Sequence, residues 1–150
     1  MDLFSFGTLM DTELLSAVTG ISACDIVSEE ATVHNRVALW VKDDHYPVLL
    51  PREGSITHGL IIRNLTADAF DRIVFFEGGE FRLEELEVVT ANGKREHVQY
   101  FADNEIKPVS DYQWCLKDWQ QSTKMDTMPR VSRYMQCYGQ MSVDEADAFW

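Results

Sequence analysis

The sequence predicts an α+β fold, with strands followed by helices, and two observations support this prediction. Residues 3–102 contain several short runs in which apolar and polar side chains alternate, as they do in half-buried strands. Residues 110–150 instead repeat apolar and aromatic side chains at helical spacing. We therefore expect one domain over residues 1–102. A helical C-terminal extension over residues 103–150 is too short for a core of its own and should pack on that domain.

The chain opens with a predicted short strand and a helix. Phe4–Phe6 form an apolar strand that ends at Gly7. We predict a helix over residues 12–19, because Asp11 can accept a hydrogen bond from the first turn of such a helix. Gly20 suits the left-handed backbone position that follows a helix.

Three further strands are predicted next. Residues 31–41 show the clearest alternation in the chain, and Asp43-Asp44 marks the turn that follows them. Residues 46–50 are an apolar run bracketed by two prolines, which favours a short strand at a sheet edge. Residues 56–63 form the third strand, in which Gly59 indicates a bulge or the close approach of another backbone.

A helix and a hairpin complete the first part of the chain. The helix is expected over residues 66–75, with Thr66 as its N-terminal cap, and a pair of glycines ends it. Residues 81–90 and 94–102 have strand patterns. Asn92-Gly93 lies in the loop between these two strands and is a strong hairpin signal.

The extension is predicted to be helical throughout. Ser110 and Gln113 form a capping box that would begin a first helix, and Ser142 begins a short last one. Gly139 suits the end of the helix between them. Apolar side chains at i, i+3, i+4 and i+7 define two buried faces, on one of which Cys115 is expected to be a small core residue. The two faces are Tyr112, Cys115, Leu116 and Trp119, and Val131, Tyr134, Met135 and Tyr138.

The composition excludes several classes of protein. The 150 residues include 25 acidic and 13 basic side chains, and the formal net charge of −12 disfavours binding to nucleic acid or anionic lipid. No apolar run approaches the roughly 20 residues that span a bilayer. The N-terminus lacks the basic and apolar regions of a secretory signal. We therefore expect a cytoplasmic protein without nucleic-acid or membrane partners. The sequence leaves the oligomeric state open, a homodimer included.

Cysteine and histidine spacing indicates neither a disulfide framework nor a metal site. The three cysteines are widely and irregularly spaced and form no C-x-x-C pair. No histidine stands at a convincing partner position for a catalytic thiol, so three reduced cysteines are the favoured interpretation. The four histidines are scattered without the spacing of zinc ligands. No metal site is therefore predicted.

Two places carry residues suited to chemistry, and the first is the end of the opening strand. In Phe4–Leu9 a strand runs into Gly7 and Thr8 before the first helix. Gly7 lets a ligand approach the main chain closely, and consecutive N–H groups there could hold a carboxylate. An ordinary strand-to-helix turn is the alternative interpretation.

The second place is Glu77, which follows Phe75-Phe76 and precedes Gly78-Gly79. Apolar neighbours raise the pKa of a carboxyl group by desolvating its charged form. A base with a raised pKa suits proton transfer near neutral pH, and the glycines would let a substrate approach it. A solvated glutamate at a helix end is the alternative, since Glu80, Glu84, Glu85 and Glu87 follow closely.

Taken together, these places resemble one known family. The opening segment resembles the "lFvYGTL" signature of the γ-glutamylcyclotransferase-like (AIG2-like) proteins, and a later proline-containing segment resembles their "YPal" strand. A third set of residues resembles the "V-x-G-x-L … LDxfEGxxY" block. The matches stand in family order and cover roughly Leu3–Phe101, but not the extension. They are Leu3–Leu9, Tyr46–Leu49, and Gly59-Leu60 with Phe70, Glu77, Gly78 and Phe81.

This resemblance implies a small mixed α+β fold, a partly closed β-barrel with flanking helices and an active pocket at one end. It implies an enzyme in which the α-amine of a γ-glutamyl compound attacks its own γ-carbonyl. The products are 5-oxoproline and a free amine, and no metal or cofactor is needed. Glu77 matches the catalytic glutamate, which acts as general acid and base. The implied substrate-binding residues are Phe6, Gly7, Thr8, Leu9 and Phe81.

The sequence departs from the family pattern at two positions. Phe6 and Phe81 stand where the family has tyrosines, so both keep the ring and lose a hydroxyl group. Losing one hydrogen-bond donor costs about 1–3 kcal/mol if its partner stays buried and unpaired. Arg36 and Arg82 could supply a charge for a substrate carboxylate, or could form surface ion pairs.

Two other functions remain open on the sequence alone. One is a binding module, in which the same pocket holds a carboxylated metabolite or the chain end of a partner without turnover. The other is a structural interaction domain that associates through an aromatic surface around Trp114, Trp119 and Trp150.

Overall fold

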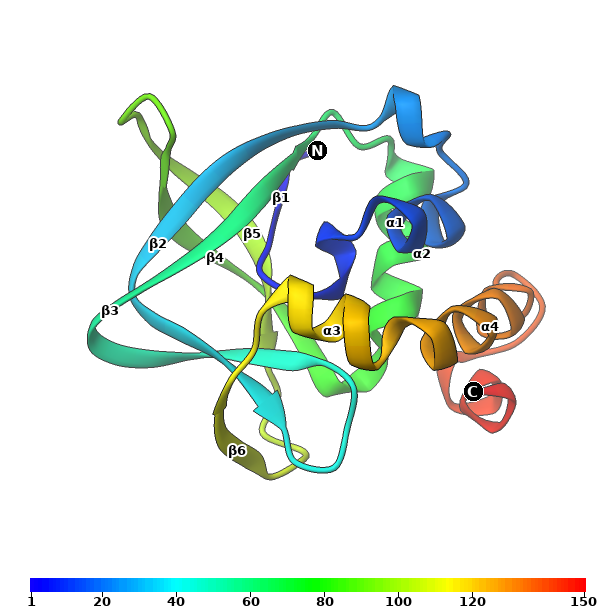
Figure 1. Cartoon of the computed structure of the whole chain (residues 1–150). Helices are drawn as coiled ribbons and strands as arrows, with labels where there is room; N and C mark the ends of the chain where they lie inside the picture. The colour runs from blue at the N-terminus through cyan, green and yellow to red at the C-terminus, as the bar shows by residue number, and fades with distance from the viewer.

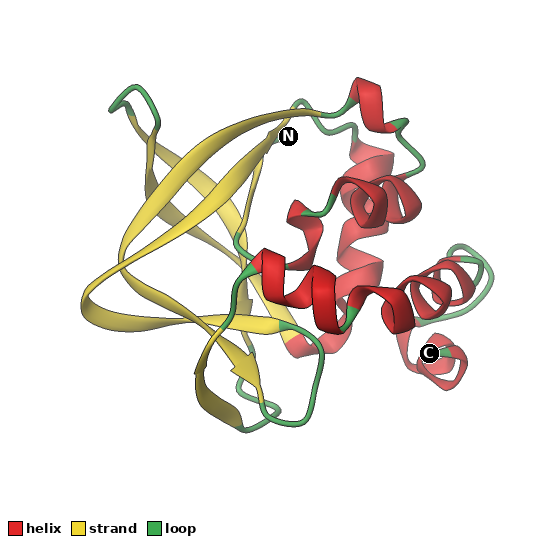
Figure 2. Cartoon of the chain, in the orientation of Figure 1, coloured by secondary structure: helices red, strands yellow, loops and turns green.

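The computed structural model describes residues 1–150 as a β-barrel with helices packed on one side of it. Figure 1 shows the strands gathered on the left and the helices on the right. Figure 2 shows the same division by colour, with strands in yellow and helices in red. The α+β class predicted from the sequence is confirmed.

The barrel is closed by five strands, and a sixth strand extends it. The strand order is β3-β1-β5-β4-β2-β6, and β3 also pairs with β2, which completes the ring. The β1–β5 pair is parallel and the other pairs are antiparallel, so the barrel is mixed. The strands are β1 Leu3–Ser5, β2 Val27–Val41, β3 Pro47–Arg63, β4 Phe81–Thr90, β5 Arg95–Asp103 and β6 Val109–Gln113.

The first two helices begin and end where their capping residues predict. Asp11 accepts a hydrogen bond from the Leu14 N–H at 2.9 Å, and Gly20 follows the helix with φ +78°. Thr66 accepts a hydrogen bond from the Ala69 N–H at 3.1 Å. The helices are α1 Thr12–Thr19, α2 Ala67–Glu77, α3 Leu116–Ser122, α4 Lys124–Met135 and α5 Val143–Ala146. Short 3₁₀ turns cover Thr8–Met10, Ala23–Asp25, Gly78–Glu80 and Asp147–Phe149.

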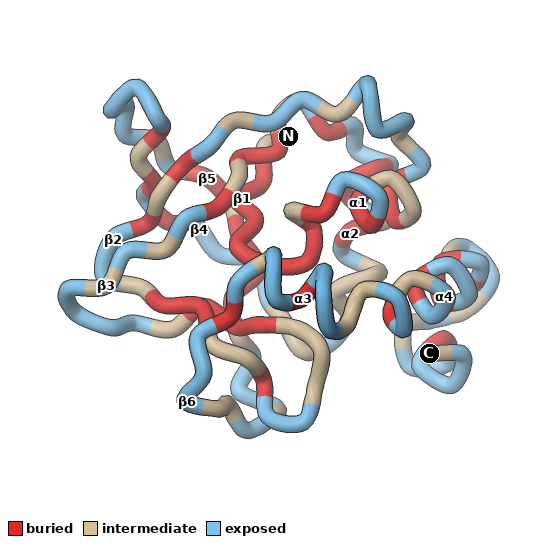
Figure 3. Tube along the Cα trace, viewed as in Figure 1, coloured by how far each residue is buried: buried red, intermediate tan, exposed pale blue.

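One hydrophobic core joins the barrel to the helices. It contains 30 buried residues, among them Leu3 and Phe4 from β1 and Ile61 from β3. Trp119 of α3 and Val131 of α4 belong to the same cluster and are fully buried. Figure 3 shows β1 buried along its length, whereas the turn between β4 and β5 is exposed. The helices after residue 103 therefore share the core of the barrel.

Two predicted strands are one continuous strand in the structure. Residues 46–50 and 56–63 were expected as separate strands, but β3 runs through both and pairs with β2. Pro47 and Pro51 lie in a part of β3 whose only strand partner is β2. The two prolines are four residues apart, so both can direct the missing N–H toward the unpaired edge.

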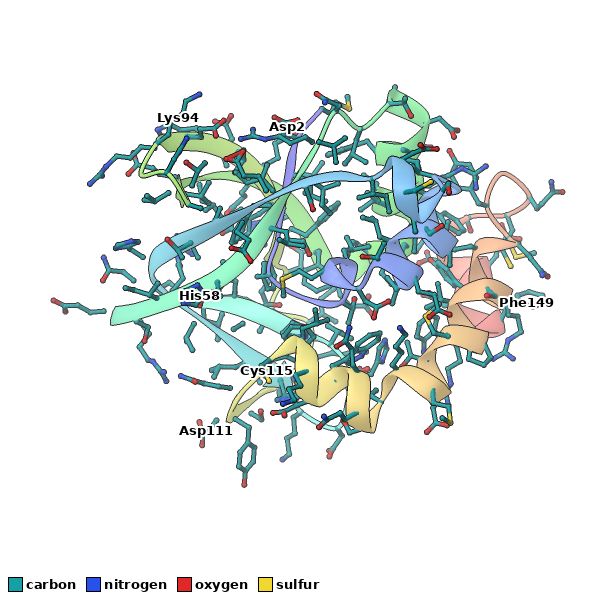
Figure 4. The ribbon with its side chains drawn as sticks, turned by 45° about the horizontal axis from the view of Figure 1, so that its top comes forward. Asp2, His58, Lys94, Asp111, Cys115 and Phe149 are labelled. Carbon is teal, nitrogen blue, oxygen red and sulfur yellow. The ribbon has the colours of Figure 1, made fainter.

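The predicted helix beginning at Ser110 is wrong, because residues 109–113 form strand β6. The edge of β2 offers backbone partners there: Trp114 N–H donates to Ala38 at 2.9 Å, and the Ser110 hydroxyl donates to the Trp40 carbonyl at 2.7 Å. This pairing replaces the local capping box. The helix begins instead at Leu116, and Cys115 is exposed rather than part of the core. Figure 4 labels Cys115 where β6 meets α3.

Gly59 lies where the backbone of β1 approaches β3 closely, one of the two possibilities that its position in the sequence indicated. A Cβ atom at this position would contact the Ser5 carbonyl oxygen and lie 2.6 Å from the ring of Phe4.

Gly59→Ala should therefore destabilise the barrel by about 2–3 kcal/mol, because a rigid backbone and a buried ring cannot both move away. The urea-unfolding midpoint measures this change. Gly79→Ala is the matched control, since nothing lies within 4 Å of its Cβ. Equal midpoints for the two variants would contradict the prediction.

Candidate functional site

A cavity of about 600 Å³ opens where the barrel meets the helices. Its walls come from the turn after β2, the end of α2, and α4 with the C-terminal turn. A second, narrow pocket of about 30 Å³ lies beside it, under the end of β1. Thr8, Tyr46, Glu77 and Phe81 line both, so the two are neighbouring parts of one site.

The structure brings all the predicted site residues together. The narrow pocket is lined by the whole loop that follows β1, and Glu77 and Phe81 face the same space from the end of α2 and the start of β4. Phe6 packs edge-on against Tyr100, and Phe81 packs against Tyr46 with ring centroids 5.6 Å apart. The predicted residues lining the pocket are Phe6, Gly7, Thr8, Leu9, Glu77 and Phe81.

The loop after β1 presents backbone donors beside this pocket. Residues 8–10 form a 3₁₀ turn, in which the N–H groups of Met10 and Asp11 donate to the carbonyls of Gly7 and Thr8 at 3.0 Å. The N–H groups at the beginning of a helical turn have no partner within it. Those of Thr8 and Leu9 therefore have no partner within the turn, and both residues line the narrow pocket. A Cβ atom on Gly7 would lie 2.9 Å from Pro47, so the loop is tightly packed against β3.

Glu77 is the last residue of α2; the residue is half-buried and its carboxyl group is largely desolvated. Burial, and secondarily the negative charge of Glu80, raise its pKa to about 8, and no hydrogen-bond donor offsets these effects. Gly78, with φ +67°, ends the helix immediately after it. The Tyr134 hydroxyl donates to the Phe75 carbonyl at 2.8 Å and so ties this helix end to α4.

The turn after β2 carries a small charged network. Asp44 lies 2.7 Å from both His45 Nδ1 and Lys107 Nζ. Burial alone would raise the pKa of Asp44, but the hydrogen bonds from His45 and Lys107 outweigh it and lower that pKa well below its usual range. Lys107 also lies 3.6 Å from Glu80. These contacts fix the turn beside Glu77.

Most residues of the outer wall of the cavity were not identified from the sequence. Asp126, Arg130, Tyr134 and Trp150 line it from the extension. The aromatic stripe of α4 was interpreted as packing, and Tyr134 does pack, but it also faces the cavity. Only the topology places these residues near Glu77, because no motif links them to it. His45 stacks on Trp150 with centroids 4.9 Å apart and so joins the two walls.

Other residues singled out from the sequence lie outside the site. Neither Arg36 nor Arg82 lines either pocket, and Arg82 pairs with Glu84 at 2.9 Å. Trp114 and Trp119 are buried, with 6% and 0% exposure, so they form no association surface.

No group of three or more His, Cys, Asp or Glu side chains is arranged to hold a metal ion. No helix combines the length and apolar character that a membrane crossing requires.

Three comparisons relate this chain to known proteins. A model of the family described as "Gamma-glutamyl cyclotransferase, AIG2-like" matches residues 3–121. AIG2-like protein A of Arabidopsis thaliana is 22% identical over 138 residues, which cover 91% of this chain and 82% of that protein. A solution structure of an A. thaliana protein has a TM-score of 0.64 at 18% identity and covers 91% of both chains. A structure named gamma-glutamyl cyclotransferase has a TM-score of 0.57 at 11% identity, covering 99% of this chain and 85% of that chain.

A closed mixed barrel with helices packed on one side defines the class of this fold, which the solved structures share. The chain belongs to the γ-glutamyl cyclotransferase, AIG2-like family. The resemblance predicted from Leu3–Phe101 is therefore confirmed. The family match ends at residue 121, so α4 and the C-terminal turn lie beyond it.

The raised pKa of Glu77 predicts a pH-dependent stability. The ordinary pKa of this carboxyl is 4.5 and the folded value is about 8, so stability is lost as pH rises from the first value through the second. Glu77→Gln should melt about 3 °C above wild type at pH 9, corresponding to about 1 kcal/mol for a partly solvated charge. At pH 4 the two proteins should melt together. Thermal melts at both pH values measure this difference, with Glu85→Gln, an exposed position, as the matched control. A Glu77→Gln melting point below wild type at pH 9 would refute the assignment.

Proposed function

We propose that this protein is a γ-glutamyl cyclotransferase that uses Glu77 as its general acid and base. One observation supports the proposal above the others: a largely desolvated carboxyl with a pKa of about 8 lines the same narrow pocket as the loop after β1. A carboxyl in this state can exchange protons near neutral pH. Membership of the family makes this chemistry the expected one.

The proposed reaction is an intramolecular aminolysis. The α-amine nitrogen of the substrate attacks the γ-carbonyl carbon, and the bond from that carbon to the leaving nitrogen breaks. Glu77 takes a proton from the attacking ammonium group and returns one to the leaving nitrogen. The products are 5-oxoproline and a free amine, and no water is consumed.

The shape of the site suits this reaction. Both reacting groups belong to one molecule, so the protein contributes mainly by holding the substrate in a ring-like conformation. The Thr8 and Leu9 N–H groups would bind the α-carboxylate at the narrow pocket. The wide cavity, at about 600 Å³, is large enough for the leaving group.

The two missing hydroxyl groups bear on a second candidate function. Phe6 and Phe81 cannot donate hydrogen bonds to a substrate, which favours a module that binds a carboxylated molecule without turnover. Tyr46 lies against Phe81 and is the one tyrosine that lines both pockets. In the enzyme that we propose, its hydroxyl is the donor available beside the γ-carbonyl.

Release of 5-oxoproline tests the proposal directly. We expect the purified protein to release it from at least one member of a panel of γ-glutamyl amino acids, γ-glutamyl amines and glutathione. Glu77→Gln should lower kcat/KM at least about 100-fold, because it removes the base and keeps the shape. Glu85→Gln is the matched control. Saturable binding without any 5-oxoproline would favour the binding module instead.

The pH profile provides a further test. If ionised Glu77 is the base, kcat/KM, corrected for ionisation of the substrate amine, should rise through pH 8 and level off above it. Glu80→Gln should move this rise to lower pH, because the charge of Glu80 contributes to the raised pKa. Initial rates between pH 6 and pH 10 measure both profiles. An unshifted rise in Glu80→Gln would assign the titration to another group.

A further inference from the structure

The last turn of α2 is held from outside the helix. The last carbonyl groups of an α-helix have no N–H donor further along the same helix. Gly78, which ends α2, donates its N–H to the Val74 carbonyl, and the next carbonyl along the chain belongs to Phe75. That carbonyl accepts a hydrogen bond from the Tyr134 hydroxyl at 2.8 Å. A residue of α4 therefore completes the end of the helix that carries Glu77.

Glu77, two residues after Phe75, has no polar partner that would fix its carboxyl group directly. No hydrogen bond contributes to its pKa, which burial and the charge of Glu80 raise to about 8. The position of the carboxyl therefore follows from the backbone of the last turn and from the side chains packed around it. A movement of that turn toward solvent would hydrate the carboxyl and lower its pKa.

Tyr134 can hold this turn because packing fixes its own position. The side chain is 3% exposed, and its ring lies against Phe75 and Trp150 with centroid distances of 4.9 Å and 5.9 Å. At the start of α4, Lys124 Nζ lies 2.9 Å from the carboxylate of Asp11, which is 2% exposed. This ion pair joins α4 to the beginning of α1. The hydroxyl group therefore projects from a helix that the rest of the fold holds in place.

A second tyrosine makes a similar bond further from Glu77 along α2. The Tyr138 hydroxyl donates to the carboxylate of Asp71, an exposed residue one helical turn before Phe75. Tyr134 lines the wide cavity with Glu77, whereas Tyr138 lines neither part of the site. The two hydroxyl groups thus connect the same parts of the chain, and only one of them acts on the turn that carries the acid.

We propose that Tyr134 is a positioning residue for the reaction described above: its hydroxyl group holds the end of α2, so that the Glu77 carboxyl stays in the cavity and away from bulk water. This inference rests on the proposed function and adds a residue to the same site. Tyr134 follows residue 121, where the family match ends. The bond to the Phe75 carbonyl therefore comes from a part of the chain that the match does not cover.

Tyr134→Phe tests the inference, because it keeps the ring and removes only the hydroxyl group. Every charged side chain around the cavity stays in place, including Glu80 and Arg130. NMR of protein labelled with ¹³C at the glutamate carboxyl carbons follows the titration of Glu77, and Glu77→Gln assigns its signal. We expect the pH midpoint of this titration to fall by at least about 0.5 in Tyr134→Phe, because the carboxyl becomes better hydrated.

Turnover gives a second measure of the same effect. Tyr134→Phe should lower kcat for 5-oxoproline release about tenfold, because the base is less well positioned. It should change KM less than about twofold, since the loop that would bind the substrate follows β1 and is packed against β3. The rise of kcat/KM with pH should move to lower pH together with the NMR midpoint. Thermal melts show that each variant is folded at the assay temperature.

Tyr138→Phe is the matched control and should equal wild type in the Glu77 titration and in kcat. An unchanged Glu77 midpoint in Tyr134→Phe, or an equal change in Tyr138→Phe, overturns the inference and leaves the proposed function intact. Absence of 5-oxoproline from the whole substrate panel with the wild-type protein overturns the proposed function. The NMR titration requires no turnover, so it still decides whether Tyr134 positions Glu77.

Discussion

The site depends on one constraint, a carboxyl group held in a desolvated position without a hydrogen-bond donor. An unpaired buried charge is unfavourable, so the surrounding structure must hold Glu77 in place. Thr66 fixes the start of α2, Gly78 fixes its end, and the Tyr134 hydroxyl ties the last turn to α4. The rigid barrel then sets the loop after β1 opposite that helix end. Holding the Glu77 carboxyl in this position lowers the stability of the folded protein when the group is ionised, but it also gives the group a pKa that allows proton exchange near neutral pH.

The sequence predicted the parts of this arrangement that local rules govern. The caps of α1 and α2 follow from Asp11 and Thr66, since a side-chain oxygen at that position satisfies a free N–H group whatever surrounds it. The hairpin between β4 and β5 follows from Asn92-Gly93. Glu77 and the loop after β1 were identified from short motifs that stand in family order, and the structure places both at one pocket.

The parts that the sequence did not predict depend on distant partners. Residues 109–113 carry a helix-capping pattern, but the free edge of β2 provides backbone hydrogen bonds that a local pattern cannot reveal. The outer wall of the cavity could not be predicted for the same reason. Asp126 and Asp147 acquire their position only when α4 packs on α1 and α2. A pattern within one segment contains no information about which segment will face it.

The two halves of the site come from different parts of the chain, and this separation has a consequence for divergence among related chains. The residues of the proposed reaction lie on the barrel and on α2, where strand pairing and tight packing restrict change. The outer wall of the wide cavity includes exposed side chains on a later helix and turn, among them Asp126 and Asp147. Substitutions there can alter which molecules are accepted and leave the acid and its helix untouched. A duplicated gene of this kind could acquire a new preference in a few steps without first losing its chemistry.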